Sequence, residues 1–209
     1  MAATTYPDAT ALQTYLTEIG ITSTVSSGTK TNALAEAVEW AETFTGRTFI
    51  TSDSSETRKY DVEGPQNGLV ICEIQDAFSI TSVSIGTGSA LTLNTDYELL
   101  PINPRTGWAY EAIRFLLSAP YGNRNVNVTG KFGWSAVPGA VNQAIMQYAA
   151  GTILAGINAG SGGSAARRKI GDREVQYAGT VNSFGTGSAA ELKLSAAISL
   201  APYVRVPYV

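Results

Sequence analysis

The segment Val126–Pro138 constrains the fold of this chain most, because within it a strand pattern gives way to a helix pattern. Apolar side chains alternate at Val126, Val128 and Phe132, which predicts a half-buried strand. The run that follows, from residue 137 to about residue 158, is rich in alanine and aliphatic side chains and predicts a long helix. The chain therefore contains both classes of element, joined by a short corner.

The corner contains two glycines, a tryptophan and a proline. Gly130 and Gly133 are expected to relax the backbone where it leaves the sheet. Proline is favoured in the first turn of a helix, where its missing N–H costs nothing, so Pro138 is expected to start the helix. Trp134 stands beside the corner as a bulky anchor. We interpret Gly130, Gly133, Trp134 and Pro138 as a structural hinge between strand and helix.

Two helices are predicted in the N-terminal part, residues 1–46. The first carries apolar side chains at positions i, i+3, i+4 and i+7, namely Leu12, Tyr15, Leu16 and Ile19. The second runs from about Thr31 to Thr45 with a wide apolar face, and Gly46 is expected to cap its C-terminus.

Between residues 47 and 132 the hydrophobic period changes from helical to alternating, which predicts an inserted, small antiparallel β-domain. The strand candidates are Glu56–Val62, Leu69–Ile74, Ile80–Ile85, Ala90–Leu93, Tyr97–Leu100, Ala112–Leu116 and Asn125–Lys131. Turns rich in glycine, asparagine and proline separate them. Because the chain is helical on both sides of this insertion, we expect an α+β fold in which the helices form one layer.

The long helix, which residues 133–158 form together with the corner, is apolar on more than one side. Tyr148 lies on one face, and Met146, Ile153 and Ile157 lie on another. A helix that is apolar all round is buried on several faces. We expect neighbouring subunits to supply some of its partners, with these four side chains as candidate subunit-interface residues.

Residues 159–209 are predicted to form a flexible arm, a short helix and a tail. The glycine- and serine-rich run at residues 158–165 is typical of a flexible linker. A short extended segment or hairpin is expected around Gly171 and Asp172. Ser188 and Glu191 have the spacing of a capping box at the start of the last helix.

The tail has a composition that is unusual for a chain end. Its residues are Tyr203, Val204, Arg205, Val206, Pro207, Tyr208 and Val209. Terminal residues are normally polar and poorly ordered, whereas tyrosine and arginine are residues that anchor interfaces. The tail either packs back on its own domain or docks on another chain, and we favour docking on another chain.

The residue inventory excludes several classes of enzyme. The chain has no histidine and its only cysteine is Cys72, so histidine-dependent catalytic triads and cysteine zinc sites are absent. The pairs Asp96 with Glu98 and Glu73 with Asp76 could act as glycosidase acids or calcium ligands. No aromatic platform or dense Asp/Asn loop accompanies them, so they are better explained as surface or subunit-contact residues. We expect no catalytic residue, no metal and no cofactor.

The low charge of the chain bears on its partners. Only 15% of the residues are charged, so the surface relies on small polar groups. A crowded homo-oligomer and a weakly charged monomer explain this composition equally well. The net charge of −3 provides no general attraction to nucleic acid or to an anionic membrane. The first residues are polar and turn-like, so no signal peptide is expected.

The pattern V-x-V-x-G-x-(aromatic)-G-W-x-x-V-P, running into an alanine-rich helix, resembles the head-to-tail connector proteins, or adaptors, of long-tailed bacteriophages. The order of elements extends this resemblance over nearly the whole chain. Two N-terminal helices end near Trp40 to Gly46 and are followed by the β-region, the corner and the long helix. An Ile-Gly-Asp segment, a short helix and the tail complete the order.

The resemblance implies a structural virion protein of the neck, assembled in the host cytoplasm. It implies a homo-oligomeric ring that matches the twelvefold symmetry of the portal protein, lies beneath it and extends the DNA channel. A stopper or tail-completion protein would attach to this ring, and DNA would pass without sequence-specific binding. In this family the C-terminal segment commonly reaches the portal, which implies portal binding by Tyr203–Val209. Removing this tail is then expected to leave a folded protein that no longer binds portal.

Two alternatives remain open at this point. The first is another virion part, such as a stopper, a tail-completion protein or a decoration protein. The second is a hydrolase or a carbohydrate-binding module built on the β-domain. The partner of the β-domain is open as well, and could be a stopper, the tail or a capsid vertex.

Overall fold

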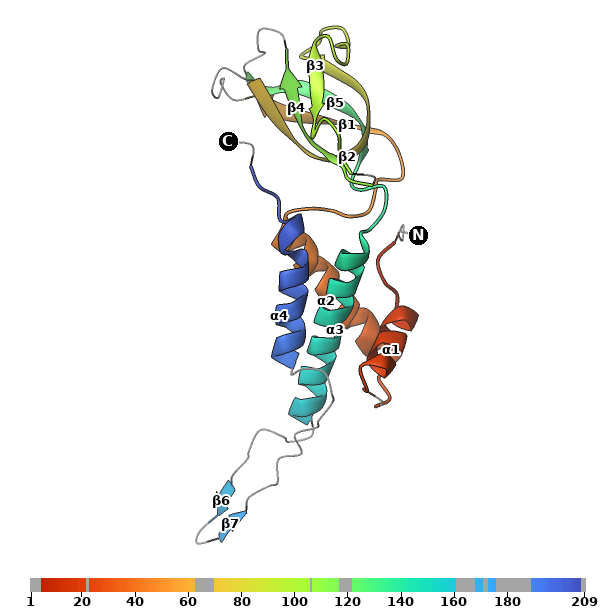
Figure 1. Ribbon diagram of the computed structural model, residues 1–209, viewed down its shortest axis with the longest axis vertical. Helices are drawn as coiled ribbons and strands as arrows, with labels where there is room; N and C mark the ends of the chain where they lie inside the picture. The colour runs from red at the N-terminus through yellow and green to blue at the C-terminus, as the bar shows by residue number, and fades with distance from the viewer. Residues whose placement is uncertain are drawn as a thin grey trace. The chain divides into compact units, whose positions relative to one another are not determined.

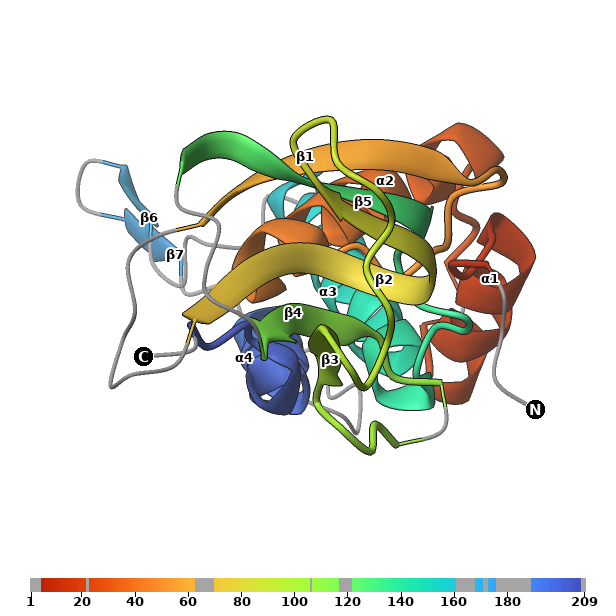
Figure 2. The same cartoon turned by 90° about the horizontal axis from the view of Figure 1, so that it is seen from above.

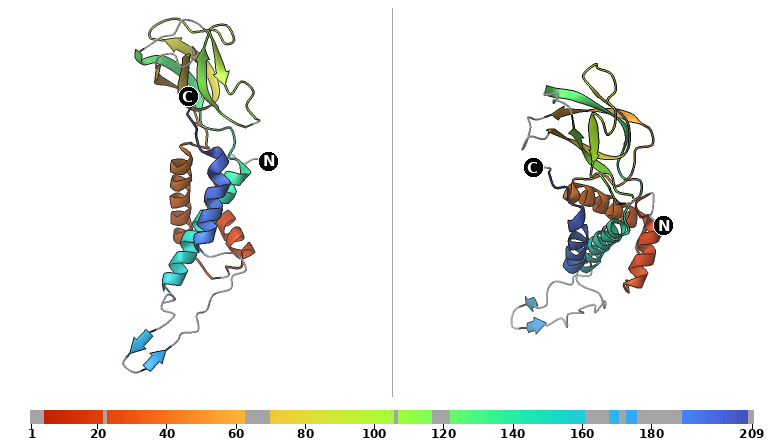
Figure 3. Two further views of the ribbon diagram at one scale, coloured as in Figure 1. Left: turned by 60° about the vertical axis from the view of Figure 1, so that its left-hand side comes forward. Right: turned by 45° about the horizontal axis from the view of Figure 1, so that its top comes forward.

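The chain folds into two compact units, one built on a sheet and one built of helices (Figure 1 and Figure 3). The computed structural model describes residues 5–21, 23–62, 70–105, 107–116, 122–160, 168–170, 173–175 and 189–207. The β unit comprises Thr45–Pro138 with the described ends of the chain, Thr5 and residues 203–207. The helical unit comprises Tyr6–Phe44 and Gly139–Pro202. This architecture confirms the predicted α+β fold with a small antiparallel β-domain.

The divisions expected at residues 47, 133 and 159 mark changes in the hydrophobic period and stay predictions. The units divide at residues 45, 139 and 203. Helices from both sides of the β insertion belong to one unit. The first residues of the tail belong to the β unit, because Tyr203 and Arg205 form hydrogen bonds with residues of that unit.

Four α-helices lie within the described part of the helical unit. They are α1 Ala9–Glu18, α2 Ser27–Thr45, α3 Gly139–Gly160 and α4 Ala189–Leu200, and a short 3-10 helix, η1 Ala201–Tyr203, follows the last. Between α3 and α4 the strands β6 Arg168–Ile170 and β7 Arg173–Val175 pair antiparallel. The expected hairpin is therefore present, although Gly171 and Asp172 lie outside the described residues, as does Ser188 of the expected capping box.

Side-chain caps set the helix starts. The carboxylate of Asp8 accepts hydrogen bonds from the backbone N–H groups of Thr10 and Ala11 at 3.0 and 2.8 Å, which makes it the N-cap of α1. The N-terminus of α2 lies at Ser27 rather than near Thr31, because the Ser26 hydroxyl accepts from the N–H of Thr29 at 3.1 Å. The polar first turn of α2 gives no hydrophobic signal, so periodicity alone places its start too late.

Helix α3 packs closely against α4, as Figure 1 shows. A Cβ atom added at Gly151 would lie 2.9 Å from the carbonyl oxygen of Ala189, so a glycine is needed for this approach. On another side of α3 the ring of Tyr148 stacks on Trp40 of α2 with centroids 4.3 Å apart. Helix α3 is thus covered on at least two faces by helices of its own chain.

The β unit holds one five-stranded antiparallel sheet. Its strands are β1 Glu56–Val62, β2 Val70–Ile85, β3 Tyr97–Leu100, β4 Tyr110–Phe115 and β5 Gly122–Phe132, in the order β1-β5-β2-β4-β3. Figure 2 shows the long, curved β2 between β5 and β4. The first part of β2 pairs with β4 and its second part pairs with β5. Aliphatic and aromatic side chains from all five strands form the core.

Strand β2 corrects the prediction of two separate strands, Leu69–Ile74 and Ile80–Ile85. The polar residues between them resemble a break, but the strand continues and changes phase. Asp76 and Ala77 are consecutive and both are buried, at 5% and 0% exposed. The register shifts at the same place, where β2 exchanges its partner β4 for β5.

The expected strand Ala90–Leu93 is also corrected. This segment forms only two isolated bridges, Ser84 with Ala90 and Leu93 with Tyr97. Leu93 is 45% exposed and is followed at once by a turn. The segment therefore has no strand beside it over enough residues to form a continuous ladder of hydrogen bonds.

Candidate functional site

A buried ion cluster lies at the point where the chain leaves α2 and enters the β unit. Arg47 and Asp76 are only 7% and 5% exposed, and Arg47 Nη1 lies 2.8 Å from Asp76 Oδ1. The same nitrogen lies 2.9 Å from Glu111 Oε1. The indole Nε1–H of Trp134 donates to the other Asp76 oxygen, Oδ2, at 2.7 Å. Both oxygens of the buried carboxylate are therefore satisfied.

Two opposing effects act on the Arg47 guanidinium. Burial is the largest effect and lowers its pKa, whereas the hydrogen bond that Arg47 donates to Glu111 and the charges of Asp76 and Glu111 raise it. The paired carboxylates prevail, and the pKa of Arg47 stays above its ordinary value. Arg47 is thus a permanently charged anchor and is unsuited to proton transfer.

The tail is tied to this cluster by four hydrogen bonds, which we call the tail clasp. Arg47 Nε–H donates to the carbonyl oxygen of Tyr203 at 2.7 Å, and the N–H of Arg205 donates to the Thr45 carbonyl at 2.9 Å. The Arg205 guanidinium donates to the carbonyl oxygens of Ile74 and Glu111, the second at 3.3 Å. Backbone and side chain of the tail are both held.

Aromatic contacts reinforce the clasp. The ring of Tyr203 lies 5.8 Å from Trp108, 6.0 Å from Phe49 and 6.1 Å from Trp134, measured between ring centroids. Phe49 and Trp134 are 0% and 1% exposed. Such tilted and edge-on contacts stabilise a cluster beyond the area they bury. Trp134, expected beside the corner, lies at the centre of this cluster.

The structure thus places two tail residues on their own chain, the interpretation that the sequence left as the less favoured one. Tyr203 and Arg205 are half-buried anchors of the clasp. Val204 and Val206 are 36% and 71% exposed, and Pro207 is exposed as well. Tyr208 and Val209 lie outside the described residues. Portal binding stays a prediction, and the exposed positions are the ones available for it.

The corner residues have specific structural roles. Gly133 has φ +100°, and a Cβ there would lie 2.0 Å from the Ile50 carbonyl oxygen. A Cβ at Gly130 would lie 2.1 Å from the carbonyl oxygen of Ser79. Both glycines therefore permit close backbone approach rather than merely relaxing the strand. Pro138 directly precedes α3, whose first residue is Gly139.

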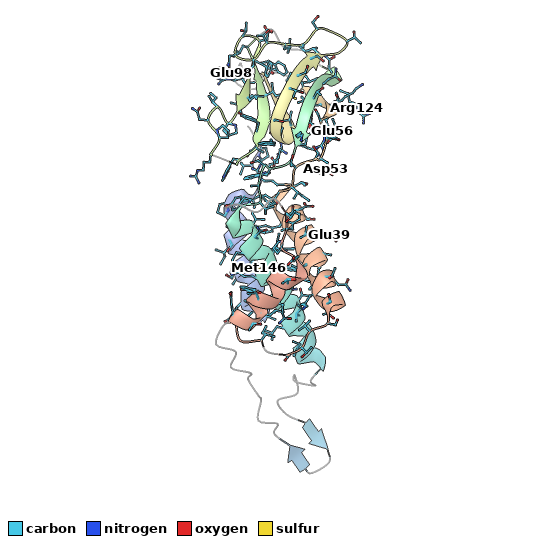
Figure 4. The ribbon with its side chains drawn as sticks, turned by 90° about the vertical axis from the view of Figure 1, so that its right-hand side faces the viewer. Glu39, Asp53, Glu56, Glu98, Arg124 and Met146 are labelled. Atoms are coloured by element: carbon cyan, nitrogen blue, oxygen red, sulfur yellow. The ribbon has the colours of Figure 1, made fainter. Side chains whose placement is uncertain are left out.

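The candidate subunit-interface residues of α3 differ in their surroundings. Besides Trp40, Tyr148 contacts Lys193, whose Nζ lies 4.3 Å from the ring centroid. Ile153 is 4% exposed within its own chain. Met146, labelled in Figure 4, and Ile157 are half-buried. Their role between subunits stays a prediction, and α2 and α4 already cover part of this helix.

The carboxylate pairs have structural partners. Asp96 accepts a hydrogen bond from the N–H of Thr92 at 2.7 Å, and Glu98, labelled in Figure 4, forms an ion pair with Arg114. Asp76 belongs to the ion cluster, and Glu73 is exposed. In the described residues, no group of three or more His, Cys, Asp or Glu side chains is placed to hold a metal ion.

A cavity of about 390 Å³ adjoins the tail clasp. Arg47, Arg58 and Arg205 contribute to its wall. Arg47 faces two carboxylates, Arg58 forms an ion pair with Glu56, and Arg205 donates to backbone carbonyls. The three cations are engaged within the chain, so the cavity has the character of a structural gap beside the tail.

An apolar stripe on α4 was not singled out by the sequence. Leu194 and Ile198 are 61% and 66% exposed, and Ala190, four residues earlier, is exposed too. We call Ala190, Leu194 and Ile198 the α4 stripe. Because α4 has apolar residues on most sides, periodicity cannot tell which of them face its own chain. The structure shows that Leu192, Ala196 and Leu200 do so.

A groove of about 450 Å³ lies elsewhere in the helical unit, between the N-terminal region of α2 and the C-terminal half of α3. We call it the α2–α3 groove. Its apolar lining consists of Val25, Ala33, Ile153 and Ile157, with Gly156 beside them. Its polar lining consists of Thr24, Ser26, Thr29, Asn32, Glu36 and Thr152. The groove combines an apolar floor with a rim rich in hydroxyl groups.

Comparisons with known proteins give structural likenesses but no match in sequence. No family model matches the chain, and no curated protein matches it. A chain from a solved structure described as the neck of an empty GTA particle, computed with C6 symmetry, aligns with 14% sequence identity and a TM-score of 0.46. The alignment covers 100% of this chain and 96% of that one.

Membrane insertion of a helix finds no support in the part of the chain that the structure describes. None of its helices combines the length and the apolar character needed to cross a bilayer.

Proposed function

We propose that this chain is a structural protein of a virion neck, an adaptor that forms a ring beneath a portal protein. The ring extends the DNA channel and provides the attachment site for a stopper or tail-completion protein. The order of elements along the sequence, which resembles that of phage connector adaptors, supports this role. The observation that carries it is the α4 stripe, an apolar surface suited to assembly.

The α4 stripe favours association for a simple physical reason. Leu194 and Ile198 expose most of their side chains to water although they stand one turn apart on the same face. Burying an aliphatic side chain of this size contributes about 1.5–3 kcal/mol. Neighbouring exposed aliphatic residues of this kind mark interaction surfaces.

A structural role without catalysis agrees with how the chain uses its buried charges. Arg47, Asp76 and Glu111 pair with one another and hold the tail. The sequence supplies no histidine as a general base. The net charge of −3 lets DNA pass without strong attachment.

The proposal predicts a ring on portal particles. Purified protein mixed with purified portal is expected to add one layer of density to one end of the portal, with as many copies as portal subunits. Electron microscopy of the mixture measures this directly. Portal particles that gain no density at saturating protein concentration would exclude the adaptor role.

Truncation after Arg205 tests the tail as the portal-binding segment. Removing residues 206–209 leaves Tyr203 and Arg205 in the clasp, so we expect an unchanged melting temperature and loss of portal co-purification. Removing residues 203–209 instead deletes the clasp and is expected to destabilise the β unit, in contrast to the folded product expected from the sequence. If the shorter truncation still co-purifies with portal, the tail is not the binding segment.

A further inference from the structure

We infer that the tail binds the portal without leaving its clasp. Tyr203 and Arg205 then act as positioning residues, and Val204, Val206 and Pro207 form the surface that the portal contacts. The inference rests on the proposed function and names both the side chains that meet the partner and the kind of surface that receives them. It is supported by the way in which the clasp divides the tail into held and exposed side chains.

The clasp is anchored on buried groups of the β unit. The carbonyl oxygens of Thr45 and Ile74 accept hydrogen bonds from Arg205, and both residues are 1% exposed. Arg47, which donates to the carbonyl oxygen of Tyr203, belongs to the buried ion cluster. Buried polar groups that are satisfied by several partners are rigid. The backbone of the tail is therefore held in one place.

The side chains that the clasp leaves exposed form a short apolar row. Val204 and Val206 are 36% and 71% exposed, and Pro207 is exposed beside them. Arg205, between the two valines, is turned to its own chain by its hydrogen bonds. Residues two positions apart lie on the same side of an extended backbone. Because the row carries no charge, the surface that fits it is an uncharged, apolar patch of the portal.

The row is also stiff by its own sequence. Val204 and Val206 are branched at Cβ, which restricts χ1. Pro207 fixes its own φ and restricts the backbone of Val206 to extended conformations. Ordering the backbone of one free residue costs roughly a factor of ten in an equilibrium constant. A row that is already ordered spares this cost on binding, whereas release from the clasp would restore it.

A reversible disulfide tests whether the tail binds in place. A Cβ added at Gly46 would lie 3.8 Å from the Cβ of Arg205, within the separation of about 3.5–4.5 Å found in disulfides. The variant with Gly46→Cys and Arg205→Cys is titrated against purified portal in its oxidised and its reduced form. The reduced form lacks the bonds of the Arg205 guanidinium, whereas the disulfide fixes the tail in the clasp. We expect the oxidised form to bind portal roughly tenfold more tightly.

The comparison between the two forms is internally controlled. Gly46 has φ +66°, so a cysteine there is strained, but the strain is present in both forms. Cys72, the only native cysteine, is 1% exposed, and burial raises the pKa of its thiol to about 12, so it does not take part in the exchange.

Two results would overturn the inference and leave the adaptor role standing. Loss of portal binding on oxidation would show that the tail has to leave the clasp. Equal binding by both forms would show that the clasp does not position the tail. If the wild-type protein does not bind portal, the proposed function falls and the inference falls with it.

Val206→Asp tests the exposed row in a chain without the disulfide. The side chain is largely in water, so we expect an unchanged melting temperature. Portal binding is expected to weaken more than roughly tenfold, because the new carboxylate would be buried against an apolar patch. Ile102→Asp is the matched control, since Ile102 is 58% exposed in the same unit but lies outside the tail. If both substitutions weaken portal binding equally, the row is not the contact surface.

Discussion

Replacing Asp76 with alanine is expected to lower the free energy of unfolding by about 3–5 kcal/mol, the range for removing one partner of a buried ion pair. The substitution leaves Glu111 as the one carboxylate paired with the Arg47 guanidinium and deprives the Trp134 indole N–H of its acceptor. Both groups are more than nine-tenths buried, so solvent replaces the lost partners poorly. Urea titration followed by tryptophan fluorescence measures the change.

The control for this prediction is Asp53→Ala in the same unit. Asp53 is an exposed carboxylate, so its removal is expected to change stability by less than about 0.5 kcal/mol. The variant Asp76→Asn removes the charge but retains an acceptor for Trp134, and is expected to fall between the two. Equal effects of Asp76→Ala and Asp53→Ala would show that the buried ion cluster does not stabilise the β unit.

Where the hydrophobic period is clear, the sequence predicts both the type of an element and its first and last residues. The bounds of Glu56–Val62 and Tyr97–Leu100 agree between sequence and structure, because turn residues flank each strand. The long helix was placed within two residues at each end, because its apolar run begins directly after Pro138. Neighbouring residues in the sequence are enough to predict an element when its bounds are set by its own residues and the turns beside it.

Strand β2 shows where local signals fail. Its middle carries a carboxylate that only a distant cation makes tolerable, since Asp76 pairs with Arg47, 29 positions earlier. Burying a charge costs free energy unless the charge is paired. The hydrophobic pattern of a strand does not show which distant residue is the partner. This polar stretch therefore falls outside both strand candidates, although it belongs to β2 and the register shift there turns Asp76 inward.

The candidate surfaces show the same limit. The composition of the tail indicated contact, but the bond from Arg47 to Tyr203 joins residues 156 positions apart. For α4, the apolar residues were evident, whereas the side that remains exposed depends on how closely Gly151 lets α4 approach α3. Composition thus identifies segments that favour contacts, and tertiary packing decides which of their side chains remain exposed to a partner.

Gly133→Ala is expected to lower the free energy of unfolding by about 2–5 kcal/mol, with a value near the upper end of this range. Its φ of +100° is unfavourable for any residue with a Cβ, by about 1–2 kcal/mol. The Cβ would also lie 2.0 Å from the Ile50 carbonyl oxygen, and such overpacking costs typically about 1–3 kcal/mol. Gly107→Ala is the matched control, because Gly107 has φ +87° but its nearest neighbour would be Ser135 Oγ at 3.7 Å. Urea titration of both variants separates the two effects. The control is expected to lose only the free energy that the positive φ costs. Equal losses would show that close backbone approach at the corner is not what requires a glycine.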